Sequence, residues 1–521
     1  MSKFNFKGFT LIELLAVILI LGIIALIATP IVNNVLKESR MGVYKTTTSV
    51  LEKKAEENCQ LESIKSKNLT TLYTIIDGKF DKPLEVKGDL PDHGYILVNN
   101  KCEVAYSFYD KNYSASKNFK EITPTINNKE NAQAYGLEWR SDINTLDDTY
   151  IRTLDASNIE DDSVNVQIGN DKVKNAFDNL DIYKDILPYT DEFDNEFILI
   201  PKFYIKKIKE KKSNEIIWNY AISKHKLDDT YYLPANFVDE GIDNNEYTEL
   251  PYVLIGKYEA GSNGKSGSEE LLVSKSNLKP KSSLNLDTIR TITSRYNNEN
   301  VKGYQQYDIH VHDLLSVLFI IEFKTMNSQN IMNGYVLNNI EVNKTGGSDV
   351  ILSSSGTVNN LGQQSFHYRG IENLWGNIWK FIDGIIVEDE TNIIYVSKNS
   401  KLYSTDISNK SYYAIESYKK IDESGLIAES GFDSDSPFIN FPIKINGEID
   451  KGVSDNYYQA PTDADKVVLI GGRWALGYNC GLSSFLNDWT VNSAQYLGGA
   501  RLVKTPWYLK IELESRWMYE K

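Results

Sequence analysis

The chain has 521 residues, a formal net charge of −15 and an isoelectric point near 5.0. This acidity argues against a nucleic-acid-binding protein, because phosphate recognition needs clustered lysines and arginines. The length predicts more than one domain, about two to four by usual domain sizes.

The N-terminus predicts a membrane-spanning helix that contains an acid. Across residues 9–28, Glu13 is the only charged residue. About 20 apolar residues cross a bilayer as a helix, and a carboxylate among them is costly and indicates function. A secretory signal would have a shorter apolar region, no acid, and a cleavage site behind that region. Here the basic leader ends at Gly8, in front of the apolar run.

This arrangement resembles the class III signal of type IV prepilins and pseudopilins, and the matching residues are Lys7, Gly8, Phe9, Thr10, Leu11, Ile12, Glu13 and Leu14. The resemblance implies that a prepilin peptidase cuts between Gly8 and Phe9 and that the new N-terminus is methylated. It also implies that Glu13 pairs with the free amine of Phe9 on a neighbouring subunit and so sets the axial register of a filament. A plain N-terminal anchor would explain the apolar run but neither Glu13 nor Gly8.

The apolar pattern continues past Pro30, which matches the kink proline of that family, and becomes amphipathic. A helix from Phe9 to about Glu57 would be roughly 75 Å long at about 1.5 Å per residue. Alternating runs at 72–76 and 94–104 then predict the short strands of a small antiparallel sheet, with a turn at Asn99, Asn100 and Lys101.

We therefore expect a leader at 1–8, a pilin module at 9–118 whose membrane helix is 9–29, and a linker at 119–150 rich in Asn and Lys. Cys59 and Cys102 share the pilin module and could form a disulfide outside the cytoplasm, which leaves Cys480 over.

Beyond about residue 150, short apolar runs alternate with clusters of Asn, Asp, Gly and Ser, which indicates a strand-rich domain. The basic run 202–212 is best explained as a half-exposed hairpin strand, because apolar residues alternate with its lysines; a polyanion-binding patch is the weaker alternative. The strand candidates are 197–203, 216–222 and 252–258, and the best helix candidate is 313–323.

Five stretches of this half resemble the C-type-lectin-like fold of phage tail and tropism-determinant proteins, namely 233–241, 253–261, 313–330, 368–385 and 469–504. Formylglycine-generating enzymes and the variable proteins of diversity-generating retroelements share that fold. The resemblance covers about 190–504. The expected fold class is α+β: a long pilin helix with a small antiparallel sheet, then a large C-type-lectin-like domain at 151–521.

In that family the marker residues hold a scaffold, and here they are Trp375, Gly376, Trp379, Gly471, Gly472, Trp474, Gly499 and Arg501. The resemblance makes the variable-type segment 473–501 a solvent-facing ligand surface. Its composition resembles antibody paratopes, and it is also what adenine-directed mutagenesis of AAC-type codons yields. A retroelement-diversified surface and an ordinary lectin-fold loop both stay open.

The candidate ligand-binding residues, led by Trp489 and Tyr478 and then by Phe485 and Tyr496, are Tyr478, Asn479, Ser483, Ser484, Phe485, Asn487, Asp488, Trp489, Asn492, Ser493, Gln495 and Tyr496.

Catalysis and a bound metal are not expected. Formylglycine-generating enzymes use two cysteines in this region, and here only Cys480 is present. His310 and His312 would face one side of a strand and could chelate a metal, with Asp308 or Asp313 as a further ligand. A turn before a helix, with Asp313 near its N-cap, is the better account. We therefore expect no cofactor.

The leading hypothesis is a minor, tip-located type IV pilin with a C-type-lectin-like adhesin domain. Its expected partners are other pilins through the N-terminal helix, prepilin peptidase, and a protein or glycan on a cell or phage surface, with no nucleic acid. It would reside in the cytoplasmic membrane before assembly and then at the cell surface. The alternatives are a phage tail-type receptor-binding protein, a catalytic member of the formylglycine-generating fold, and a DNA-uptake pseudopilin, which the net charge disfavours.

Overall fold

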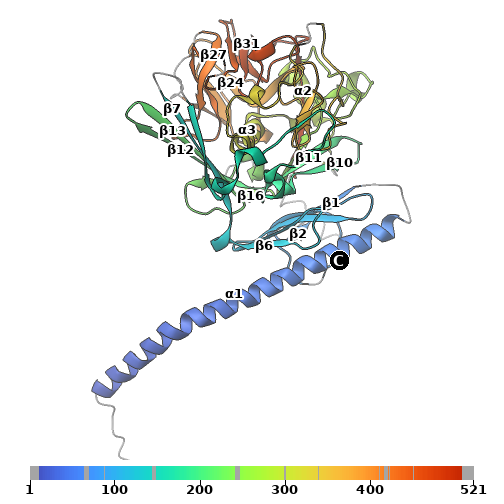
Figure 1. The fold of residues 1–521 in the computed structure, drawn as a ribbon. Coiled ribbons are helices and arrows are strands. Elements are labelled where there is room, and N and C mark those ends of the chain that lie inside the picture. Colours follow the sequence, from blue (N-terminus) through green and yellow to red (C-terminus); the bar gives the residue numbers. More distant parts are fainter. Residues whose placement is uncertain are drawn as a thin grey trace, which may run out of the picture.

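The computed structural model describes residues 11–63, 70–86, 88–142, 148–240, 247–298, 301–337, 340–409, 411–415, 421, 423–449 and 451–506. The chain folds into a long helix, a small sheet and a large β-rich domain (Figure 1). This arrangement confirms the α+β class. The expected leader 1–8 and the processing residues Gly8 and Phe9 lie outside the described residues.

Helix α1 (Leu11–Ser63) begins the described chain and contains Pro30. Its first half carries exposed apolar side chains on all sides and extends away from the rest of the molecule (Figure 1). It is the one described helix that is long and apolar enough to cross a membrane. Its second half is amphipathic and packs on the small sheet through Tyr44, Leu51 and Ala55.

The small sheet is antiparallel, with the strand order β2-β1-β3-β4-β5-β6. Its strands are β1 (Thr71–Ile76), β2 (Lys79–Phe80), β3 (His93–Val98), β4 (Val104–Tyr109), β5 (Tyr113–Lys117) and β6 (Thr125–Asn128). The last strand falls within 119–150, so part of the expected linker belongs to this small sheet.

Both faces of this sheet are buried. Successive strand residues point to opposite faces, and Tyr73, Ile96 and Phe108 pack against α1. On the other face, Tyr95 and Leu97 join a core that continues into the large domain. The sheet therefore lies as a middle layer between α1 and the large domain (Figure 1).

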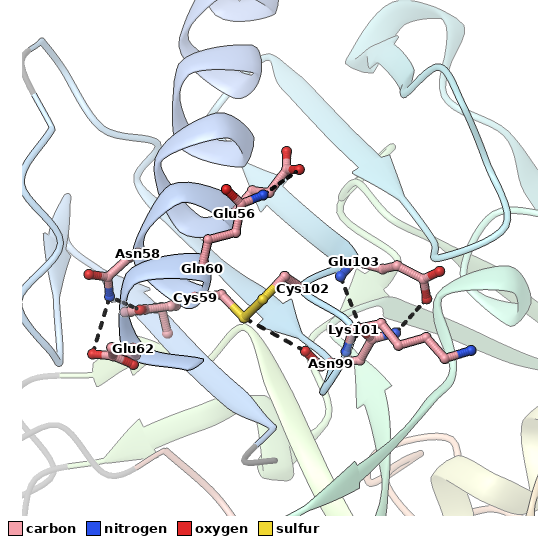
Figure 2. The surroundings of a disulfide bond; sticks show 10 residues. Glu56, Asn58, Cys59, Gln60, Glu62, Asn99, Lys101, Cys102 and Glu103 are labelled. Carbon is pink, nitrogen blue, oxygen red and sulfur yellow. Dashed lines mark hydrogen bonds between the residues drawn. A yellow bond between two sulfur atoms is a disulfide. The ribbon is translucent and has the colours of Figure 1, made fainter. Parts of the chain in front are cut away.

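A disulfide ties the end of α1 to this sheet. Cys59 on α1 bonds Cys102 in the turn between β3 and β4, with their Cα atoms 5.6 Å apart (Figure 2). The expected pairing is thus present, and Cys480 is a free, buried thiol. The bond holds the turn at 99–101 against the last turns of the helix.

The large domain begins before residue 151. Strand β7 (Ala134–Asp142) pairs with β13 along nine residues, so the prediction of a linker is wrong for this stretch too. The polar residues of 119–150 resemble a loop. Within β7, however, Tyr135, Leu137 and Trp139 alternate inward and are buried. The strands of this sheet, in the order β14-β12-β13-β7-β8, include β8 (Asp148–Leu154), β12 (Tyr204–Lys212), β13 (Glu215–Ser223) and β14 (Tyr231–Tyr232).

Two further sheets form most of the remaining core. The first has the order β10-β11-β17-β33-β20, with β10 (Leu187–Thr190), β11 (Glu196–Pro201), β17 (Tyr252–Gly256), β20 (Tyr304–Gln306) and β33 (Leu502–Lys504). The second has the order β26-β25-β24-β30-β31-β29-β27-β28, with β24 (Trp379–Val387), β25 (Ile394–Ser397), β26 (Tyr412–Ile415), β27 (Gly425–Gly431), β28 (Phe441–Ile445), β29 (Asn456–Gln459), β30 (Lys466–Ile470) and β31 (Phe485–Thr490), while β32 (Gly498–Gly499) pairs with β24.

Short ribbons complete the domain. They are the pairs β15 (Val238–Glu240) with β16 (Tyr247–Glu249) and β18 (Gly261–Ser262) with β19 (Leu272–Val273), and the sheet of β9 (Gln167–Ile168), β21 (Gly356–Thr357), β22 (Phe366–Tyr368) and β23 (Ile371–Glu372).

Among its described residues, the large domain contains the α-helices α2 (Leu286–Ser294) and α3 (Ile309–Phe323). Every residue of α3 is buried, so it is a core helix rather than an amphipathic surface helix. Its N-cap is Asp308, whose carboxylate accepts a hydrogen bond from the Val311 N–H at 2.8 Å. The helix thus begins before the expected start, and Asp313 lies inside it rather than at its N-cap.

Candidate functional site

The first candidate site is the apolar half of α1. Glu13 lies within this half on an exposed helix face. A surface of this kind is stable only in lipid or against other apolar helices. The described geometry therefore supports a membrane anchor that can also pack into a helical assembly.

The second candidate site is the segment 473–501, which surrounds β31. In Figure 1, β31 lies at the end of the large domain away from α1. The loop 471–484 connects β30 to β31, and a second loop leads from β31 to β32. A ligand surface built from these loops would point away from the membrane-anchored end of the chain.

The predicted scaffold residues are all buried, and they are Trp375, Gly376, Trp379, Gly471, Gly472, Trp474, Gly499 and Arg501. Arg501 holds two segments together, because its guanidinium donates to the carbonyls of Gly256, at 2.7 Å, and of Glu372. Trp375 packs on Phe366 with ring centroids 4.1 Å apart. These contacts fit a structural role for the group.

Gly472 shows why glycine is needed at the start of this loop. Its φ is +78°, a backbone conformation that favours glycine, and an added Cβ would lie 2.4 Å from the Cys480 sulfur. The loop therefore turns back tightly on itself, and Cys480 fills the space beneath it.

The candidate ligand-binding residues divide by exposure. Tyr478, Asn492, Gln495 and Tyr496 are exposed, whereas Asn479, Ser483, Asp488 and Ser493 are half-buried. The buried members are Ser484, Phe485, Asn487 and Trp489. The segment thus contributes a binding surface through its loops and contributes core residues through β31.

The prediction that Trp489 and Phe485 are binding anchors is wrong. Trp489 is 5% exposed and packs against Phe381 at a centroid distance of 5.8 Å. Phe485 is 2% exposed and packs against Phe441 at 4.9 Å. Both lie on β31, where alternate side chains point into the core.

What remains is a small exposed surface, which we define as Leu337, Tyr478 and Tyr496. Tyr478 and Tyr496 are 56% and 65% exposed, and the ring of Tyr496 lies 6.4 Å from that of Trp474. Leu337 is 55% exposed and approaches Gly477, beside Tyr478. No sequence signal pointed to Leu337, because it comes from a separate loop more than a hundred residues earlier in the chain.

The two histidines considered as metal ligands do not converge. Both lie on α3, where residues two apart point in different directions. The His310 ring bonds the Ser397 carbonyl at 2.8 Å, and the His312 ring bonds the Tyr307 hydroxyl at 3.2 Å. Burial lowers the pKa of His310 to about 4 and that of His312 to about 3. Within the described ranges, no three His, Cys, Asp or Glu residues are grouped to hold a metal ion.

Cys480 lacks the setting of a catalytic thiol. Burial raises the pKa of its thiol to about 12, and the Sγ–H donates to the Arg473 carbonyl at 3.2 Å. A reactive cysteine instead has a lowered pKa and some exposure.

The basic strand β12 forms the expected hairpin with β13, but most of its charge is engaged. Lys207 is buried against Asp313, and Lys209 lies 4.4 Å above the Trp218 ring. Lys202, just before the strand, pairs with Glu249. These contacts leave little free charge for a polyanion.

Comparison with known families adds one match. Residues 3–29 match the model of the prokaryotic N-terminal methylation motif. Together with the long apolar helix α1, this match supports a type IV pilin N-terminus, which implies processing by prepilin peptidase, membrane anchoring before assembly, and assembly with other pilins. A comparison with curated proteins finds no match.

Proposed function

We propose that this chain, which begins as a type IV pilin, is a minor, tip-located pilin whose large domain is an adhesin. The observation that carries the proposal is the position of β31 and its loops, which lie at the end of the molecule away from α1 (Figure 1). The loops bear exposed Tyr478 and Tyr496, and tyrosine offers a large contact area at low entropic cost.

The ligand would be a protein or glycan on a cell or phage surface. Aromatic anchors often dominate an interface, and each contributes roughly 2 kcal/mol or more. The C-type-lectin-like fold and retroelement diversification stay part of this proposal. Under it, varied residues would concentrate at exposed loop positions such as Tyr478, Asn492, Gln495 and Tyr496, since β31 has to retain its core residues.

Other functions have less support. A phage tail-type receptor-binding protein has no use for a prepilin signal. A catalytic member of the formylglycine-generating fold would need an activated thiol, and burial raises the pKa of Cys480 instead. We therefore propose a non-catalytic domain without a cofactor.

The adhesin proposal is tested by the double substitution Tyr478→Ala and Tyr496→Ala on whole piliated cells. We expect adhesion to the target cells to fall at least about tenfold, while the amount of the protein on pili stays unchanged. Tyr247→Ala is a matched control, because Tyr247 is an exposed tyrosine on a different ribbon, β16. Full adhesion by the double variant would move the binding face elsewhere.

The assembly role of Glu13 is tested by Glu13→Val. The substitution removes a costly charge from the apolar helix, so insertion and processing should proceed normally. Incorporation into pili should nevertheless fall sharply, because the incoming N-terminal amine loses its partner. The measurement is the amount of the protein in sheared pili, and wild-type amounts would refute the register mechanism.

The tip position is tested separately by gold labelling of wild-type pili. We expect the label at the pilus end, and label along the shaft would contradict the tip position.

A further inference from the structure

Three side chains from distant parts of the large domain meet in its core. Lys207 comes from β12, Asp313 from α3, and Asn440 from the residue before β28. The Lys207 Nζ lies 2.6 and 2.7 Å from the two carboxylate oxygens of Asp313 and 3.4 Å from the amide oxygen of Asn440. The Asn440 N–H in turn donates to Asp313 at 2.7 Å, so the carboxylate fixes the backbone that carries the amide.

This trio lies in surroundings of low polarity. The side chain of Lys207 is fully buried, that of Asp313 is 4% exposed, and the ring of Phe432 lies 5.6 Å from Nζ. Burial lowers the pKa of Lys207 and raises that of Asp313, and the charge of each partner opposes these shifts. Both shifts favour moving the shared proton from the amine to the carboxylate, which would leave a nucleophilic amine.

The side-chain amide of Asn440 has hydrogen-bond partners at its oxygen but none at its nitrogen among the described residues. Its oxygen accepts hydrogen bonds from Lys207 and, at 3.4 Å, from the Tyr220 hydroxyl. Its Nδ2 is buried, and no described group accepts a hydrogen bond from it. A buried amide nitrogen without an acceptor is destabilising. The carbonyl is thus polarised, while nothing in the described structure holds the nitrogen in place.

We propose that Lys207 and Asn440 become joined by an intramolecular amide bond between Nζ and the side-chain carbon Cγ. Asp313 takes a proton from the ammonium of Lys207, and the neutral amine attacks Cγ. Asp313 then gives that proton to Nδ2, the C–Nδ2 bond breaks and ammonia leaves, and the attacking nitrogen gives its second proton to the Asp313 carboxylate. One amine and one primary amide yield one secondary amide and one ammonia, with no oxidant or reductant.

The arrangement suits this reaction because the amine is already close to its target. The amide oxygen is 3.4 Å from Nζ and is bonded directly to the carbon that the amine would attack, so the structure already holds the two groups as neighbours, and such positioning speeds a reaction. Tyr220 donates to the oxygen on which negative charge develops, as an oxyanion-stabilising group does. Asp313 accepts from the Lys207 Nζ and from the backbone N–H of Asn440, so its carboxylate lies beside both residues that would react.

A second buried lysine shows what a purely structural arrangement looks like. Lys380 pairs with Glu259 at 3.2 Å and donates to the Gly376 carbonyl at 2.7 Å. The nearby Asn377 donates its Nδ2 to Glu259 and to the Asn343 carbonyl. Its nitrogen is therefore held in place, unlike that of Asn440, and we propose no bond there.

The cross-link would tie together residues 233 positions apart. It would join the β12–β13 hairpin to the β27–β28 hairpin across the core. Such a link constrains the unfolded chain as a disulfide does, without depending on an oxidising environment. The proposal does not depend on the adhesin role.

The test is the intact mass of the full chain, taken from the native host and measured under denaturing conditions. We expect the wild type to be lighter, by one ammonia, than the processed, disulfide-bonded sequence requires. A tryptic digest should join the peptide that contains Lys207 to the one that contains Asn440.

Two variants should restore the full mass. Lys207→Arg keeps the charge but cannot form the amide, and Asn440→Ala removes the acceptor. Lys209→Arg is the matched control on the same strand and should keep the deficit. Because the mass is read from unfolded protein, reduced stability of a variant does not obscure the result. A wild-type chain of full mass with two separate peptides would overturn the proposal.

Discussion

At the scale of single residues, Trp489 distinguishes the core of the variable-type segment from its surface. Trp489 on β31 packs against Phe381 of β24 and is nearly inaccessible, whereas Tyr478 projects from the preceding loop. Large-to-small substitutions in a core cost about 3–5 kcal/mol for Trp→Ala, and surface changes stay within about 0.5 kcal/mol.

We therefore predict that Trp489→Ala lowers the unfolding free energy of the chain by about 3–5 kcal/mol. Tyr478→Ala should leave it nearly unchanged. Urea unfolding of the detergent-solubilised chain, followed by near-ultraviolet circular dichroism, measures both variants. If Trp489→Ala unfolded like the wild type, β31 would not be a core strand.

Composition could predict where an exposed aromatic surface lies but not which aromatic residues form it. The Asn, Ser and Tyr content of the segment 473–501 pointed to the loops that carry Tyr478 and Tyr496. It could not separate Phe485 and Trp489 from them, because that separation depends on the register of β31, which sequence composition does not fix.

Lys207 shows a similar limit. Ile205 and Lys207 lie two residues apart on one strand, so they share a face, and both are buried. The alternation of β12 therefore contained a signal for a buried lysine. Its partners, Asp313 and Asn440, could not be found from the sequence, since they lie more than a hundred positions away.

At the scale of elements, local sequence patterns predicted the helices and strands that have a long, uninterrupted apolar or alternating run. Helix α1 and the hairpin β12–β13 follow from long apolar or alternating runs, and they form near the expected bounds. The prediction of a linker at 119–150 was wrong because half-buried Glu138 and Arg140 alternate with the buried side chains of β7, and half-buried strands with polar outer faces resemble loops.

The start of α3 was missed for a different reason. The apolar run 314–323 is obvious, but the first turn contains His310, His312 and Asp313, which are usually exposed residue types. Here each is buried with a partner from another part of the chain, such as Ser397 for His310. Tertiary contacts therefore extend the helix to a cap at Asp308.

At the scale of the whole molecule, the small sheet and the large domain form one continuous body. They share a hydrophobic core, and polar contacts also join them. Tyr109 donates to the Lys202 carbonyl at 3.1 Å, and Asn127 donates to Asp181. The sequence could predict two modules but not that one sheet is buried between α1 and the large domain, because this needs the long-range pairing of both. A force applied at the exposed loops would pass to α1 through this junction.

His225 makes the junction sensitive to acid. Its ring bonds the Ser114 hydroxyl on β5 at 2.9 Å, and the adjacent Lys224 donates to Ser116 at 2.7 Å. The pKa of His225 is lowered to about 4, chiefly by burial and also by the charges of Lys224, Lys202 and Lys129, while Asp181 opposes the shift. The fold therefore requires the neutral ring.

We predict that acid loosens this junction and that His225→Gln prevents part of the effect. The unfolded chain binds a proton at His225 near pH 6.5, whereas the folded chain does so only near pH 4. The stability contributed by the neutral ring is thus complete above about pH 6.5 and is lost as the pH falls toward 4, by up to about 3 kcal/mol. The glutamine amide can keep the contact to Ser114 without titrating.

Hydrogen exchange of the β5 amides at pH 7 and pH 5 should therefore show less acid-induced loss of protection in the variant than in the wild type. Equal losses in both would mean that other groups, such as the buried carboxyls, control the response.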